Sequence, residues 1–199
     1  MIFPILRFYL IFSNMQVKGT SIKTTRDFVK AKFPNRYEEW LKTLSKDSQK
    51  IYTETLNVSD WYDLKIGYTE PMDKIVDLFY NKNAQKGGEE MGMYSAEIGL
   101  NGIYKVFLLV ASPQYLMKRG TRTMEAFYMP SEIEVIEKGD KMAIVKIKKF
   151  DGISKALEYR IAGWIAKALD LCKCKSRSYR ITSYLSAGQD STTIEFKWE

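Results

Sequence analysis

The chain has 199 residues and a formal net charge of +7, and 45% of its residues are hydrophobic. This composition excludes an intrinsically disordered chain, and the length is typical of a single domain that buries its own core. The moderate positive charge predicts solubility and weak, nonspecific attraction to polyanions, so we expect no specific nucleic-acid binding.

The sequence contains no histidine. A Ser-His-Asp triad, a Cys-His pair, a His-rich zinc site and a histidine-ligated haem are therefore excluded. The two cysteines, Cys172 and Cys174, are too few for a disulfide framework or a four-ligand zinc site, and they favour structural thiols in a reducing cytoplasm. No catalytic motif is present, so we expect a protein that is not an enzyme and holds neither a cofactor nor a metal.

The chain begins with an apolar run, residues 1–12, interrupted by Arg7 alone. The run is too short to span a bilayer, and it lacks the basic region and cleavage site of a signal peptide. We therefore interpret residues 1–14 as an N-terminal extension, predict no membrane span, and expect a single domain over residues 15–199.

Residues 16–128 are predicted to form a helical block. Gly87 and Gly88 are interpreted as a break between two of its helices. A short strand is expected near residues 16–19, followed by helices that start at the candidate N-caps Thr24 and Thr25, at Pro34, at Ser45, at Thr69 and at Ser112.

Hydrophobic alternation replaces helical spacing after residue 130. Ala143, Val145 and Ile147 alternate with outward positions, and similar alternation recurs at residues 132–135 and 193–198, on either side of a helix predicted at residues 154–171. Alternation of this kind predicts antiparallel strands with helices on one face. The predicted fold class is α+β, with the N-terminal helical block packed on a C-terminal antiparallel sheet of about four strands in the order ββαββ.

Basic residues are concentrated in the C-terminal region. They are compatible with a patch for phosphates or anionic lipid, or with a solvated sheet face that discourages edge pairing; the scarcity of interleaved aromatic residues favours the solvated face. Lys173, Lys175 and Arg177 occupy alternate positions in line with the apolar Tyr179 and Ile181 of the predicted penultimate strand. Either that strand begins near Ser178, or a bulge reverses its faces. The basic residues of the region are Lys138, Lys141, Lys146, Lys148, Lys149, Lys173, Lys175, Arg177 and Arg180.

Gly163 lies in the middle of the helix predicted at residues 154–171. Glycine costs about 1 kcal/mol relative to alanine in a helix interior. This cost predicts that the helix approaches a neighbouring element or a ligand closely at Gly163.

The segment from Met91 to Phe127 is rich in methionine and aromatic residues. At helical spacing, such residues form either plain core or an adaptable apolar pocket with a few hydroxyl groups. The candidate ligand-binding residues are Tyr104, Phe107, Leu108, Tyr115 and Phe127, together with Trp164 of the last helix.

Several short segments, taken in order, resemble one bacterial protein family first grouped from Myxococcales. The likeness covers residues 15–198, and Asp63 stands where that family usually has proline. The segments include Val17-Lys18-Gly19-Thr20, Trp61-Tyr62-Asp63-Leu64, Gly102-Ile103-Tyr104, Ser112-Pro113, Phe127-Tyr128 and Gly163-Trp164, with an aromatic strand ending at Trp198.

That family is distantly similar to the fold of haem nitric-oxide-binding, vinyl-4-reductase-type and Bet3-like domains. The resemblance implies helices packed on an antiparallel sheet around an apolar pocket, which holds haem, a small hydrophobic molecule or an acyl chain in the three groups. The haem group needs a histidine and a Tyr-x-Ser-x-Arg motif, whereas the nearest match here, Tyr184-Leu185-Ser186-Ala187-Gly188, lacks the arginine. The metal-binding cysteines of the second group are missing from residues 190–193, and acylation would need Cys172 or Cys174 to face the pocket.

The sequence therefore predicts a non-enzymatic, cytoplasmic binding or sensor domain for a small apolar or amphipathic ligand, with histidine-ligated haem excluded. The alternative is a protein-interaction or dimerisation scaffold of the same fold, with a filled core and no ligand. An enclosed pocket or a copurifying ligand distinguishes the first from the second, which needs an exposed apolar patch.

Overall fold

The computed structural model describes residues 15–100, 111–172, 174 and 176–199. The extension predicted at residues 1–14 lies outside this part of the chain. No helix within the described ranges is both long and apolar enough to cross a membrane.

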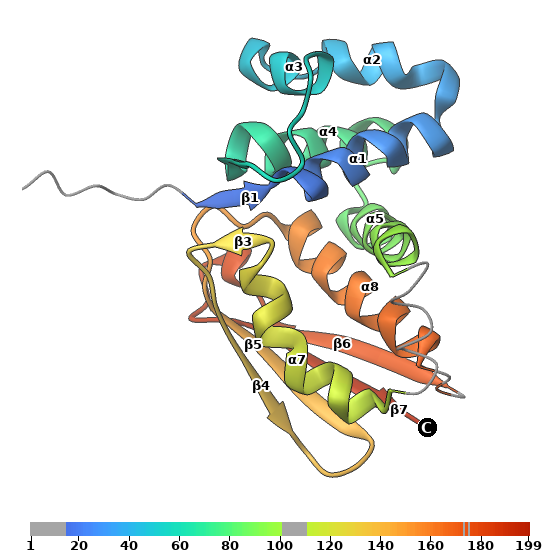
Figure 1. Ribbon diagram of the computed structural model, residues 1–199, viewed down its shortest axis with the longest axis vertical. Helices are drawn as coiled ribbons and strands as arrows, with labels where there is room; N and C mark the ends of the chain where they lie inside the picture. Colours follow the sequence, from blue (N-terminus) through green and yellow to red (C-terminus); the bar gives the residue numbers. More distant parts are fainter. Residues whose placement is uncertain (1–14, 101–110, 173, 175) are drawn as a thin grey trace, which may run out of the picture.

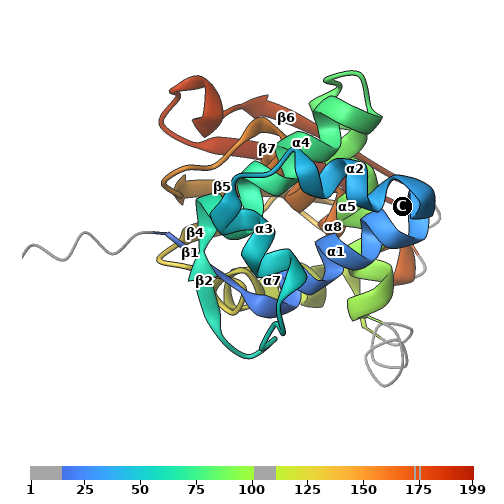
Figure 2. The same cartoon turned by 90° about the horizontal axis from the view of Figure 1, so that it is seen from above.

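Helices make up most of the first half of the fold and form a block at the top of Figure 1. Seen from above, α2 and α3 lie over the other helices of this block (Figure 2). In chain order the elements are β1 (Gln16–Lys18), α1 (Gly19–Lys32), the 3₁₀ turn η1 (Pro34–Arg36), α2 (Tyr37–Lys42), α3 (Lys46–Thr53), β2 (Trp61–Asp63), the π-helical turn η2 (Lys65–Thr69), α4 (Glu70–Phe79) and α5 (Ala84–Gly99).

The second half contains the main sheet and two long helices. Its elements are α7 (Pro113–Glu125), β3 (Tyr128–Met129), β4 (Glu132–Glu137), β5 (Met142–Lys149), α8 (Lys155–Leu171), β6 (Arg177–Ser183), the 3₁₀ turn η3 (Leu185–Ala187) and β7 (Thr192–Trp198). Strands β4 to β7 form an antiparallel sheet in the order β4-β5-β7-β6. The predicted α+β class, with its ββαββ ending, is confirmed.

A smaller sheet, β2-β1-β3, ties the beginning of the chain to the segment that enters the main sheet. Its central residue, Val17, is fully buried and pairs with Tyr62 on one side and Tyr128 on the other. The predicted strand near residues 16–19 is thus present, and the Trp61–Asp63 segment pairs with it.

The two faces of the main sheet differ as the alternation predicts. Ala143, Val145 and Ile147 of β5 are buried, and the register places Phe196 opposite Ala143 and Ile194 opposite Val145. α7 packs over β4 and α8 packs over β6 and β7, and α8 lies between the sheet and the helical block (Figure 1). A helix in such a position is buried all round, and this explains why α8 is hydrophobic on nearly every face.

Capping side chains set several of the helix starts. Ser45, Ser112 and Ser154 each accept a hydrogen bond from the backbone N–H three residues further on, at the beginning of α3, α7 and α8. Pro34 begins the short turn after α1. These four starts agree with the sequence prediction.

Two other boundary predictions are wrong. Thr24 and Thr25 are not N-caps, because α1 begins at Gly19 and both hydroxyls donate to the carbonyl of Ser21 within the helix. Gly87 and Gly88 do not separate helices but lie buried inside α5. Tertiary packing outweighs the local signal at both places.

The penultimate strand begins at Arg177, and its register shifts between Ile181 and Ser183. The predicted start near Ser178 is therefore confirmed to within one residue. The guanidinium of Arg177 lies 2.8 Å from Asp170, while Lys173 and Lys175 lie outside the described residues.

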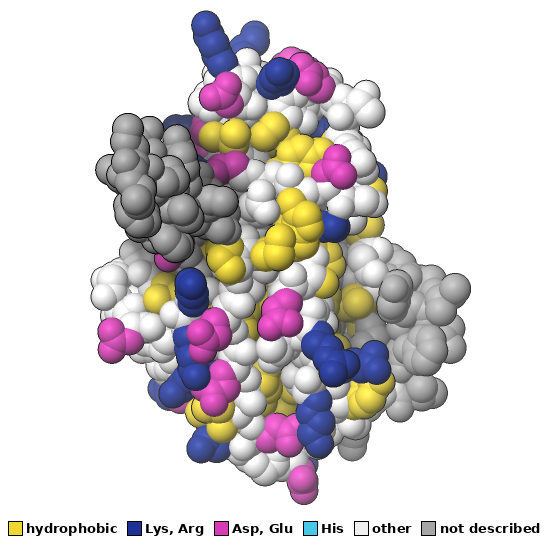
Figure 3. Space-filling model, turned by 60° about the vertical axis from the view of Figure 1, so that its left-hand side comes forward, with side chains coloured by type: hydrophobic (Ala, Val, Ile, Leu, Met, Phe, Trp, Pro, Cys, Tyr) yellow, Lys and Arg dark blue, Asp and Glu magenta, His cyan; other side chains and the backbone are white. Residues whose placement is uncertain are grey.

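Within the described part of the basic C-terminal region, three of the nine basic residues form ion pairs: Lys148, Arg177 and Arg180. Lys148 lies 3.0 Å from Glu134, and Arg180 lies 2.9 Å from Glu195. Over the lower part of the face in Figure 3, positive and negative side chains are interspersed rather than segregated. Exposed pairs of this kind add little stability, but they leave no broad cationic surface on that face, which favours the solvated-face interpretation.

α5 and α8 cross with their backbones in contact. A Cβ atom added to Gly92 would lie 2.1 Å from the carbonyl oxygen of Arg160, and one added to Gly163 would lie 2.6 Å from that of Glu89. Gly88 is equally tight against α8. The close approach predicted for Gly163 is confirmed, and the neighbouring element is α5.

We predict that Gly163→Ala lowers the free energy of unfolding by about 1–3 kcal/mol, because the added methyl group overlaps the backbone of α5. Urea denaturation followed by circular dichroism measures the change. Gly99→Ala is the matched control: its Cβ would have no neighbour within 4 Å among the described residues, so alanine is expected to be neutral or to stabilise the helix by up to about 1 kcal/mol. Equal losses for the two variants would contradict a packed crossing.

Candidate functional site

A charged side chain, Arg160, lies buried where three helices meet. It projects from the second turn of α8 toward α1 and α5, and it is only 2% exposed. We call Arg160 and the side chains around its guanidinium the arginine cluster; the others are Thr24, Thr25, Tyr68, Met91 and Ser95.

Both terminal nitrogens of the guanidinium donate hydrogen bonds. Nη1 donates to Thr25 Oγ1 at 2.7 Å and makes a weak contact with Met91 Sδ at 3.9 Å. Nη2 donates to Ser95 Oγ at 2.7 Å and to Thr24 Oγ1 at 3.2 Å. The Cζ atom lies 4.7 Å from the centre of the Tyr68 ring, at cation–π distance. The cluster therefore joins α1, α5, α8 and η2.

The hydroxyl groups of the cluster can accept from Arg160 because each donates its own proton elsewhere. Thr24 and Thr25 donate to the carbonyl of Ser21, and Ser95 donates to the carbonyl of Met91. Hydrogen bonding around the guanidinium is thus well satisfied. Its charge is surrounded only by neutral groups.

No carboxylate compensates the charge of Arg160. Among the described residues, no Asp or Glu oxygen lies within 4.0 Å of its guanidinium. The remaining positions, 1–14, 101–110, 173 and 175, contain no Asp or Glu at all. A buried charge without an opposite partner carries a desolvation cost of several kcal/mol, so this arrangement is unusual for a purely structural residue.

Buried tyrosines extend the polar region beyond the arginine cluster. The hydroxyls of Tyr68 and Tyr128 lie 3.2 Å apart, and Tyr52 donates to the carbonyl of Gly67 at 3.0 Å. Burial raises the pKa of Tyr52 and Tyr128 above the ordinary range, and the nearby charge of Arg160 opposes that rise. Tyr52 and Tyr128 therefore stay neutral near neutral pH and do not balance the arginine.

A second buried polar side chain, Glu158, lies two residues before Arg160 on α8 and is fully buried. It accepts hydrogen bonds from the backbone N–H of Ser186 at 3.2 Å, from the Ser186 hydroxyl at 2.5 Å and from the Thr192 hydroxyl. These bonds attach α8 to η3 and to the start of β7. Ser186 belongs to the segment that most resembles a Tyr-x-Ser-x-Arg motif. In this chain its backbone N–H and its hydroxyl both donate to the carboxyl group of Glu158.

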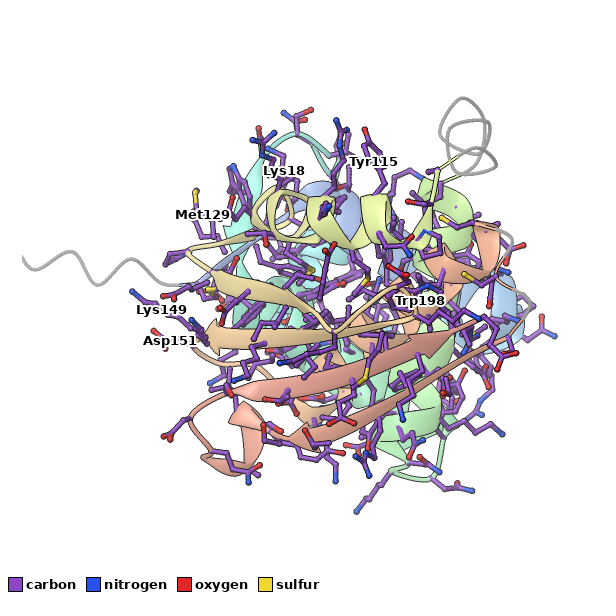
Figure 4. The ribbon with its side chains drawn as sticks, turned by 90° about the horizontal axis from the view of Figure 1, so that it is seen from below. Lys18, Tyr115, Met129, Lys149, Asp151 and Trp198 are labelled. Carbon is purple, nitrogen blue, oxygen red and sulfur yellow. The ribbon has the colours of Figure 1, made fainter. Side chains whose placement is uncertain are left out.

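The candidate ligand-binding residues do not gather in one described site. Tyr104, Phe107 and Leu108 lie outside the described residues. Tyr115 is 49% exposed and points away from the strands, beneath the guanidinium of Arg119 (Figure 4). Phe127 and Trp164 are partly buried and pack against the main core. Their role in ligand binding stays a prediction.

Two hollows open on the described surface. One, of about 820 Å³, lies between the ends of β5, β6 and β7 and includes Trp198 (Figure 4). The other, of about 550 Å³, lies between α1 and the α4–α5 turn, where the rings of Phe33 and Phe79 stack 4.0 Å apart. Lys32 and Lys86 border this second hollow.

The two cysteines occupy a structural position. Cys172 is buried at the end of α8, and its burial raises the pKa of its thiol to about 11. Burial also raises the pKa of Cys174. Protonated thiols are poor nucleophiles and metal ligands. Within the described ranges, no group of three or more Asp, Glu or Cys side chains is placed to hold a metal ion.

Sequence reasoning missed the arginine cluster. A usable signal was present, since Arg160 interrupts a helix whose neighbours Leu157, Ile161 and Ala162 are all apolar. The partners are not visible in the sequence, because Thr24 and Thr25 were assigned to a helix cap and Ser95 is one of many serines. Only the tertiary fold brings them to Arg160.

We predict that Thr25→Val lowers the free energy of unfolding by about 1.5–3 kcal/mol, since valine has nearly the same shape but cannot accept from the buried guanidinium. Denaturant unfolding measures the loss. Thr123→Val is the control, because the exposed Thr123 hydroxyl only donates to the carbonyl of Arg119, and a change within about 0.5 kcal/mol is expected. A neutral Thr25→Val would mean that Arg160 does not depend on this hydroxyl.

Comparisons with known proteins place the fold. The sequence matches no protein-family model, and no curated protein matches it. An H-NOX protein from S. oneidensis, solved in the Fe(II)NO ligation state, superposes with a TM-score of 0.70 at 10% identity, over 92% of this chain and 99% of that one.

Two further H-NOX structures agree. The unliganded Fe(II) protein from K. algicida gives a TM-score of 0.67 at 11% identity, over 92% of this chain and 96% of that one. The I5F mutant from T. Tengcongensis gives 0.66 at 13% identity, over 92% and 97%. The chain therefore has the H-NOX fold, as the distant resemblance implied, while membership of the Myxococcales-type family stays a prediction.

Proposed function

We propose that this chain is a non-enzymatic binding or sensor domain that uses the H-NOX fold without histidine-ligated haem and binds a small amphipathic molecule. The observation that carries the proposal is the arginine cluster, a buried convergence of one cation and several hydroxyl groups inside a fold that this chain shares with an H-NOX protein solved in the Fe(II)NO ligation state. A few convergent polar groups within apolar surroundings are typical of small-molecule sites. We further propose that the protein works in the cytoplasm, in keeping with its free thiols.

The residues present do not fit the haem of the fold relatives, which were studied in Fe(II) states and for haem distortion. Haem iron is commonly held by histidine, and this chain has none. Cys172 is protonated near neutral pH, with its pKa raised to about 11 by burial. The segment around Ser186 offers no arginine, and its serine is bonded to Glu158. No step of the proposed function therefore involves haem.

A scaffold without a ligand is the second candidate, and two observations favour it. α5 and α8 touch through Gly92 and Gly163, so no space remains between them at that point. Large hydrophobic side chains are also exposed at Ile98, Tyr115 and Met129, and hydrophobic surface forms a band across the middle of the face in Figure 3. Exposed apolar surface of this kind marks protein contacts when it is contiguous.

Native mass spectrometry of freshly purified protein distinguishes the two candidates, because it reports bound ligand and oligomeric state together. The binding-domain proposal predicts a monomer or oligomer that carries extra mass lost on denaturation. A ligand-free protein of unchanged mass that assembles into a defined oligomer would favour the scaffold instead.

We also predict that the purified protein is colourless and that added haemin is removed by gel filtration, because no imidazole is available to hold the iron. Absorption spectroscopy checks this. A haem H-NOX protein treated in the same way serves as the positive control. A Soret band that survives gel filtration at stoichiometric intensity would defeat the haem-independent proposal.

A further inference from the structure

We propose that the ligand of this domain carries an oxyanion, a carboxylate or a phosphate group, and that this group supplies the counter-charge missing from Arg160. The inference rests on the proposed function and narrows it from any amphipathic molecule to an anionic one. It stands on the geometry of the arginine cluster.

The guanidinium of Arg160 lacks a counter-charge. Arg160 is 2% exposed, and no Asp or Glu oxygen of the described residues lies within 4.0 Å of its guanidinium. Neutral hydroxyls satisfy the hydrogen bonds of a guanidinium, but they do not neutralise it. In a low-dielectric setting an oxyanion is attracted to such a group far more strongly than in water. The folded protein is therefore better balanced with an anion than without one.

The two ends of the Arg160 guanidinium differ in how accessible they are to an anion. The bonds of Nη1, to Thr25 and Met91, are buried, whereas those of Nη2, to Thr24 and Ser95, are only partly buried. Thr24 and Ser95 belong to facing positions on α1 and α5, and both keep partial exposure to solvent. Nη2, between α1 and α5, is therefore the less buried end of the guanidinium, and the hydroxyls of Thr24 and Ser95 lie 3.5 Å apart over it.

Binding of an anion exchanges the hydrogen bonds that Nη2 makes to Thr24 and Ser95. An oxyanion at Nη2 replaces Thr24 Oγ1 and Ser95 Oγ as the acceptor. In the structure, the hydroxyls of Thr24 and Ser95 donate to the carbonyls of Ser21 and Met91. Hydroxyl groups rotate freely to new acceptors. Each can turn its proton toward the anion, so that one charged and two neutral donors converge on the same group. Arginine and hydroxyl donors together are typical of carboxylate and phosphate recognition.

Titration calorimetry of the unmodified protein tests the inference with probes that share one tail and differ in their head group. They are octanoate, octyl phosphate, octanol and octyltrimethylammonium, with inorganic phosphate as the probe without a tail. We expect octanoate or octyl phosphate to bind about tenfold or more tighter than octanol, and the cation not to bind. The better of the two anions identifies the head group.

The other possible binding results contradict either the anion inference, the proposed amphipathic ligand, or both. If octanol binds as tightly as both anions, the anion inference is wrong and the proposed amphipathic-ligand function stands. If no octyl probe binds, both are wrong. If inorganic phosphate binds as tightly as octyl phosphate, Arg160 takes a free oxyanion and the proposed amphipathic ligand is wrong.

A variant then assigns the preference to Arg160. Arg160→Gln should reduce the preference for the anion over octanol from about tenfold to near unity, while affinity for octanol is retained. Arg180→Gln is the matched control, because the Arg180 side chain is 74% exposed and paired with Glu195, and it should leave the preference unchanged. A preference that survives Arg160→Gln places the anion elsewhere. If that variant does not fold, the comparison of probes on the unmodified protein still decides the inference.

Discussion

The contact between the backbones of α5 and α8 is the constraint on which the rest of the structure depends. Side chains normally hold two helices about 8–10 Å apart, but Gly92 and Gly163 remove that spacer from both partners. The carbonyl of Arg160 lies against Gly92, so the same residue whose backbone touches α5 also sends its side chain past it to α1. A wider crossing would leave Arg160 short of Thr25 and expose its charge to an apolar gap.

Much of the fold was predictable from the sequence, because its signals are local. Serine caps at Ser112 and Ser154 act within one turn of the helices they start. Strand alternation around Val145 reflects a pleat of period two, which no other element produces. Gly163 is also a local signal, because glycine destabilises a helix interior and its presence there indicates a close contact with a neighbouring element.

The candidate site was not predictable, and the reason is physical. A buried arginine is compatible with many surroundings, and only the partners decide which one it has. Thr25 and Arg160 lie on α1 and α8, at opposite ends of the sequence, and no periodicity links them. Locally, Thr24 and Thr25 predict a helix start because threonine is a good N-cap, and Gly88 predicts a break because glycine is a poor helix former. Both signals were real preferences overridden by contacts between distant elements.

The two buried polar side chains of α8, Glu158 and Arg160, have a mechanical consequence. Glu158 is bonded toward η3 and β7, while Arg160 is bonded toward α1 and α5. Residues two apart on a helix are separated by roughly 200° around its axis, since one turn holds about 3.6 residues. Rolling α8 by a single position would break the hydrogen bonds of both side chains at once, and this fixes the rotation of the helix about its own axis. The sheet and the helical block therefore set the rotation of α8 jointly, the sheet through Glu158 and the helical block through Arg160.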